Sequence, residues 1–133
     1  MPQVTGEFDV KMTPETLSDT AAQSGLGRLS LNKRYHGALD ASAHGEMLSA
    51  RASVAGSAGY VALERVEGTL DGRHGSFYLQ HSGTMTRGAP ALSVTVVPDT
   101  GTEQLQGLSG SLAIRIEEGK HYYDFTYELT EAQ

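Results

Sequence analysis

Apolar and polar residues alternate along most of this chain, and turn-forming residues separate the alternating stretches. Such alternation places successive side chains on opposite faces of a β-strand. The clearest example runs from Tyr60 to Met85, where the dipeptide Asp71-Gly72 divides two alternating segments. Because Asp-Gly tolerates the positive φ angles of a two-residue turn, this stretch is predicted to form a β-hairpin.

The length of that turn also predicts which residues of the hairpin face each other. With Leu70 opposite Arg73, Glu64 lies opposite Leu79, and every second residue shares a face with this pair. Leu79 marks the face as the interior, so Glu64 and His81 are expected to point inward together.

Further alternating segments occupy most of the remaining chain, at 4–12, 26–39, 41–54, 90–98, 111–117 and 121–129. Residues 13–25 break the pattern, and Thr13 with Pro14 is expected either to start a short helical turn or to lie in a plain crossing loop. In the later hairpins, Met85 is expected opposite Leu92, and a turn at 118–119 places Leu112 opposite Phe125.

These segments predict an all-β fold of about eight strands in a mostly sequential, antiparallel order. We expect one domain over residues 1–133, an eight-stranded, mostly antiparallel up-and-down barrel, with a β-sandwich as the alternative. Closure of a barrel removes the exposed strand edges of an open sheet, and eight strands leave room for side chains or for one small ligand.

Composition narrows the classes of partner. The net charge is −6 without a basic cluster, so neither a nucleic-acid partner nor a membrane is expected. The chain has no cysteine, which excludes disulfides and thiolate chemistry. With no signal-like N-terminus and no long apolar run, we expect a cytoplasmic protein.

Several stretches resemble a known bacterial family. They are GEFDV, YHGALDASAHGEML, VALERVEGTLDGRHGSFYLQHSGTM and VVPDTGTEQLQGLSG, which together span nearly the whole chain. On these residues the chain resembles domain-of-unknown-function family 3224, whose fold is similar to the eight-stranded barrel of allene oxide cyclases. The resemblance implies a barrel with an apolar cavity. It implies no catalytic residues, because no cyclase motif matches here, and fold alone does not determine function.

Glu64 and His81 are the strongest candidates for chemistry. On adjacent strands their side chains are within hydrogen-bonding reach, and a buried carboxylate needs such a partner. The pair could act as general acid and base. The alternative interpretation is a buried polar pair that only stabilises the core.

Other residues are predicted to line the lumen around this pair. Glu46 joins it if Leu48 pairs with Glu64, whereas a shift of one residue places Glu46 in solvent. Tyrosines suit an apolar cavity that needs a few hydroxyl groups. The predicted lining beyond Glu46 consists of Tyr60, Val96, Tyr123, Phe125 and Tyr127, for which ordinary core packing is the alternative.

The opposite face of the hairpin carries Arg65, Tyr78 and Gln80 beside exposed apolar residues. We expect this face to form a homo-oligomer interface, with an ordinary solvent-exposed surface as the alternative. The five histidines have no short paired spacing, so neither a metal nor another cofactor is expected.

Three functions fit these residues. The first is a small, mostly apolar molecule bound in the lumen and converted by a cofactor-free cyclase or isomerase reaction. The second is a carrier or sensor with the same cavity and no catalysis. The third is a solid barrel that serves as a homo-oligomeric assembly protein. The sequence does not decide whether the protein is an enzyme.

Overall fold

The computed structural model describes residues 2–130, which form a closed, eight-stranded antiparallel barrel. Each strand pairs with the next along the chain, and β8 returns to pair with β1. The strands are β1 (Gln3–Pro14), β2 (Gly27–Gly37), β3 (Leu39–Arg51), β4 (Ala58–Leu70), β5 (Arg73–Thr86), β6 (Ala89–Val96), β7 (Leu108–Glu117) and β8 (Lys120–Leu129). The predicted all-β barrel is therefore confirmed.

The central hairpin has the predicted register. Leu70 pairs with Arg73 and Glu64 with Leu79, and the turn residues Asp71 and Gly72 both have positive φ. The predicted pairing of Leu112 with Phe125 between β7 and β8 is also confirmed.

Two local predictions are wrong. Met85 pairs with Pro90 and not with Leu92, because β5 and β6 are joined by a tight turn at Arg87-Gly88, where both φ angles are positive. The helical turn expected from Thr13 lies further along the chain. Thr13 and Pro14 belong to β1, and the helix α1 (Asp19–Gln23) is capped by the Ser18 hydroxyl.

One end of the barrel is closed by a packed core. The rings of Phe77 and Phe125 stack with centroids 6.0 Å apart, and Tyr127 packs against Phe125 at 5.6 Å. Leu105, from the short 3₁₀ helix η1 (Glu103–Leu105), lies over Gly75 and is buried among these residues. Burial of this apolar surface is the main stabilising contribution of the fold.

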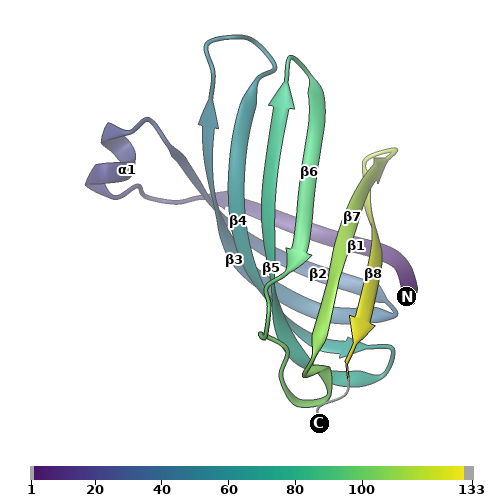
Figure 1. Cartoon of the computed structure of the whole chain (residues 1–133). Helices are drawn as coiled ribbons and strands as arrows, with labels where there is room; N and C mark the ends of the chain where they lie inside the picture. The colour runs from purple at the N-terminus through teal and green to yellow at the C-terminus, as the bar shows by residue number, and fades with distance from the viewer. Residues whose placement is uncertain (1, 131–133) are drawn as a thin grey trace.

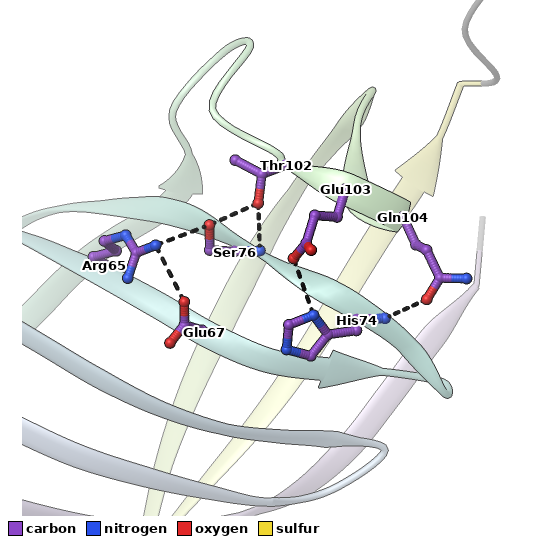
Figure 2. A network of polar contacts seen from close by, with 7 residues as sticks. All are labelled: Arg65, Glu67, His74, Ser76, Thr102, Glu103 and Gln104. Carbon is purple, nitrogen blue, oxygen red and sulfur yellow. Dashed lines mark hydrogen bonds and ion pairs between the residues drawn. The ribbon is translucent and has the colours of Figure 1, made fainter.

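The segment between β6 and β7 covers the part of β5 that β6 does not reach (Figure 2). Its side chains replace a neighbouring strand: Thr102 Oγ1 accepts a hydrogen bond from the Ser76 amide at 3.0 Å, and Gln104 Oε1 accepts one from the His74 amide at 2.8 Å. The Thr102 amide donates to the Ser76 carbonyl. We call residues 97–107 the strap.

The other end of the barrel is open. In Figure 1 the β3–β4 and β5–β6 turns rise above the β7–β8 turn. Across the described residues, β6 and β7 share one bridged pair, Thr95 with Ser111, so the two strands diverge toward this end. Four apolar side chains on the lumen face of four strands remain exposed there: Met12, Met85, Leu92 and Ile116. The lumen is thus filled at one end and unfilled at the other.

Candidate functional site

A buried polar cluster lies in the middle of the lumen around the Glu64 carboxylate. Its Oε2 is 2.7 Å from Lys33 Nζ and 2.7 Å from His81 Nε2, and its Oε1 accepts a hydrogen bond from the Tyr35 hydroxyl. Glu64 is 1% exposed and His81 is 3% exposed. Three donors therefore satisfy one carboxylate that water hardly reaches.

Small residues on β3 allow this cluster to form. β3 lies between β2, which carries Lys33 and Tyr35, and β4, which carries Glu64. Ala43 pairs with Lys33, and Gly45 pairs with Glu64. A Cβ atom on Gly45 would lie 2.0 Å from the Leu63 carbonyl oxygen and 2.9 Å from the Glu64 Cβ, so a larger residue there would push away the part of β4 that carries Glu64. The β2 side chains can thus reach across β3 to Glu64.

The cluster keeps Glu64 ionised. Burial alone would raise the pKa of its carboxyl, but the His81 hydrogen bond and the Lys33 charge outweigh burial and lower the pKa to about 2. Burial, together with the Glu64 charge, raises the pKa of the Tyr35 hydroxyl well above its ordinary value. Glu64 is therefore a permanent anion near neutral pH and does not release or take up protons there.

His81 is the group of the cluster that remains open toward the lumen. Its Nε2 must carry a proton, because this atom lies 2.7 Å from an ionised carboxylate. Its Nδ1 has no hydrogen-bond partner among residues 2–130, although every enclosed side-chain nitrogen or oxygen in that range has one. Nδ1 therefore borders open space. With Nε2 bound to Glu64, Nδ1 is the ring nitrogen that is left to contact a molecule in the lumen.

An apolar pocket of about 370 Å³ occupies the open end of the lumen, which we call the mouth pocket. Its wall comes from β2 to β6 and includes Leu29, Met47, Tyr60, Met85 and Leu92. Tyr60 connects the pocket to the cluster, because its ring centroid is 6.5 Å from that of His81. The pairs Tyr60–Gly83 and Ala62–His81 are adjacent on one face, so His81 lies one layer below the pocket wall.

The Tyr60 ring is positioned by a glycine. A Cβ atom at Gly83 would lie 2.3 Å from the ring, so only glycine leaves room for the ring over β5. Burial, followed by the nearby Glu64 charge, raises the pKa of the Tyr60 hydroxyl, which keeps this group a hydrogen-bond donor. Tyr60 is therefore a polar residue of the pocket wall, and His81 lies next to its ring, just outside the residues that line the pocket.

The structure separates the residues that were predicted to line the lumen. Tyr60 lies at the mouth pocket, whereas Tyr123, Phe125 and Tyr127 are buried in the filled part of the barrel, and Val96 is buried opposite Leu79. The Tyr123 hydroxyl accepts a hydrogen bond from the Leu39 amide and donates to the His36 carbonyl. The Tyr127 hydroxyl donates to the Asp71 carboxylate, so both tyrosine hydroxyls already have protein partners.

The lumen position predicted for Glu46 is wrong. Glu46 pairs with Leu63, an odd shift from the predicted register, and such a shift moves a side chain to the other face of the sheet. Its carboxylate lies outside the barrel, 2.6 Å from Arg28 Nε. The Arg28 hydrogen bond lowers the pKa of Glu46, which is an exposed surface carboxylate.

Arg65, Tyr78 and Gln80 lie on the outer face, as predicted. Arg65 pairs with Glu67 at 3.2 Å, and Tyr78 is exposed beside it. Val61 and Leu63 are also exposed on this face. The contact between copies predicted for these residues stays a prediction.

Sequence reasoning missed Lys33 and Tyr35. A signal was present, because both residues continue the alternation of Leu29 and Leu31 and so share the inward face. The charge of Lys33 masked that pattern. Its ammonium group also lies 5.2 Å from the Phe8 ring centroid, a cation–π contact that further compensates its burial.

Within residues 2–130, no group of three histidine, cysteine, aspartate or glutamate side chains is placed to hold a metal ion. The described part of the chain also contains no helix long and apolar enough to cross a membrane.

Comparison with known proteins gives the family of this chain. Residues 4–127 match the family model described as "Protein of unknown function (DUF3224)". A crystal structure of a DUF3224 protein of unknown function from Shewanella oneidensis MR-1 is similar, with 51% sequence identity, a TM-score of 0.93 and coverage of 99% of each chain. No curated protein matches. With a family model covering most of its length and a half-identical solved relative, the chain belongs to the DUF3224 family.

Proposed function

We propose that the barrel binds a small, mostly apolar molecule in the mouth pocket, with a polar group of that molecule facing His81 Nδ1. The observation that supports this proposal most strongly is an unpartnered ring nitrogen on a side chain that is only 3% exposed, below an apolar pocket. No protein donor or acceptor within residues 2–130 occupies this nitrogen, which borders open space, so it is available to a polar group of a bound molecule.

The apolar wall supplies the affinity in this proposal. Met85 and Leu92, on the lumen face, are 42% and 43% exposed, so both side chains can bury further apolar surface when a molecule enters. The volume of about 370 Å³ lies in the range of small-ligand sites. The filled end of the barrel stays as it is, and binding needs no rearrangement there.

A pair of tryptophan variants tests this binding. Met47 is half-buried and lines the pocket, whereas its neighbour Leu48 points outward from the same strand. Met47→Trp fills the pocket and should abolish binding of an apolar fluorescent dye, while Leu48→Trp should bind it as the wild type does. Native mass spectrometry of the protein purified from its own cell would identify the resident molecule. Equal dye binding by both variants would overturn the proposal.

A second candidate is a cofactor-free isomerase or cyclase in the same pocket. It is favoured by the proton arrangement at His81, in which Glu64 holds Nε2–H and leaves Nδ1 to exchange protons with the lumen. In this candidate Nδ1 takes a proton from one carbon of the bound molecule and returns it to another, and Glu64 orients the ring without changing its own protonation.

Deuterium incorporation distinguishes the enzyme from the carrier. In heavy water, an enzyme would place deuterium on carbon in the molecule identified by mass spectrometry, and His81→Asn would stop this incorporation while binding persists. A resident molecule that stays chemically unchanged and undeuterated with the wild-type protein would exclude the enzyme and leave the carrier.

A further inference from the structure

The mouth pocket has a single cation at its rim. Among the described residues that line it, Arg51 is the only charged side chain, and no acidic residue is present, although the whole chain has a net charge of −6. Arg51 follows Met47 and Ser49 on the lumen face of β3, at the end of the strand. The pocket thus combines an apolar wall with one positive charge at its entrance.

Arg51 also lacks the ion pair that most arginines of the barrel form. Arg28, Arg34, Arg65 and Arg115 each form an ion pair with a carboxylate. Within residues 2–130, Arg51, Arg73 and Arg87 form none, and Arg51 is the one of these three that lines the mouth pocket. A guanidinium group recognises carboxylates through paired hydrogen bonds, so an unpaired arginine beside an apolar cavity is suited to an anion with an apolar body.

We infer that the ligand of the mouth pocket is an amphipathic anion whose carboxylate pairs with Arg51 at the rim and whose apolar body extends down the lumen toward His81. This inference rests on the proposed function, because it names the chemical class of the molecule bound in the same pocket.

Strand register gives the length that such a molecule spans. Arg51 pairs with Ala58, and His81 pairs with Ala62 on the same strand. Four residues of a strand extend about 13 Å. A medium-length acyl chain with its carboxylate at Arg51 therefore reaches the layer of Tyr60 and approaches His81. A second polar group at the far end of the molecule would contact His81 Nδ1 there.

Decanoate and decanol form a matched pair for the test, since they share the apolar body and differ in charge. Each would displace an apolar fluorescent dye from the wild-type protein near neutral pH. We expect decanoate to bind about three- to tenfold more tightly, the range of a partly exposed charge-assisted contact. High salt should reduce this preference.

Arginine variants assign the preference to one residue. Arg51→Gln should bind both compounds equally, at the affinity of the wild type for decanol. Arg87→Gln is the control, because Arg87 lies in the nearby β5–β6 turn and is not part of the pocket wall. It should keep the preference for decanoate.

The outcomes separate the two proposals. If the wild type binds both compounds with equal affinity, or if Arg51→Gln keeps the preference, the anion inference is overturned and the binding function stands. If neither compound displaces the dye, and the dye binds Met47→Trp as well as the wild type, the binding function itself fails.

Discussion

At the scale of single residues, the position of Glu64 determines what the lumen can do. A carboxylate at this depth is tolerated because Lys33, Tyr35 and His81 each donate to it. This arrangement fixes which ring nitrogen of His81 is protonated. Glu64 therefore acts on any bound molecule only through His81.

The Glu64 cluster predicts a loss of stability in acid. The pKa of Glu64 is about 2 in the folded protein against an ordinary value of 4.5, so its contribution is present above pH 4.5 and is lost as the pH falls toward 2. A shift of this size corresponds to about 3 kcal/mol in the free energy of unfolding. Urea denaturation at a series of pH values from about 6 to about 3 would measure the first part of this loss.

Two variants control that experiment. The double variant Lys33→Met/Glu64→Gln removes both buried charges together, and its stability should depend less on pH over this range. Glu7→Gln, which changes an exposed carboxylate on β1, should behave like the wild type. If the double variant loses as much stability in acid as the wild type does, other carboxylates cause the loss.

Part of the site could be predicted at this scale and part could not. The contact between Glu64 and His81 follows from one hairpin, because a two-residue turn fixes the register of its strands. Lys33 reaches Glu64 across an intervening strand, and that contact depends on the small residues Ala43 and Gly45 and on the closure of the barrel. Local alternation carries no information about such a contact.

At the scale of elements, turn length explains which registers were predicted correctly. The β5–β6 register was wrong by an even number of residues, so His81 kept its inward face although its partner is Val94 and not Val96. The β3–β4 register was wrong by an odd number, and Glu46 changed face. The six residues that connect β3 and β4 contain no dipeptide that specifies a tight turn.

The strap is expected to stabilise β5 through its side chains. Thr102→Val removes the oxygen that accepts from the Ser76 amide and lies 2.8 Å from the Ser76 hydroxyl. We expect a loss of about 1 kcal/mol in the free energy of unfolding, the usual contribution of such hydrogen bonds. Thr95→Val, at an exposed side chain on β6, is the matched control. Faster hydrogen exchange of the Ser76 amide in the Thr102 variant would locate the effect, and equal stability of the two variants would contradict it.

At the scale of the whole molecule, the barrel divides into a packed end and an open end, where apolar side chains of the lumen face remain exposed. Leu105 is 1% exposed at the filled end, whereas Leu92 is 43% exposed at the open end. The same substitution at these two sites should therefore have opposite consequences for stability and for binding.

Leu105→Ala should lower the free energy of unfolding by about 2–5 kcal/mol, because it leaves a cavity in a packed core. Leu92→Ala should change it by about 0.5 kcal/mol or less and should weaken dye binding instead. Thermal unfolding and dye titration of both variants would check this division. Equal destabilisation by the two substitutions would show that the open end is packed in solution.

The single bridged pair between β6 and β7 has a consequence for how a molecule could enter the barrel. Among residues 2–130, no bridged pair joins β6 and β7 between Thr95–Ser111 and the open end, so strand pairing is weakest along this seam of the barrel. If a long, flexible molecule binds in the mouth pocket as proposed, this seam offers it a lateral route, because separating the two strands there breaks little strand pairing.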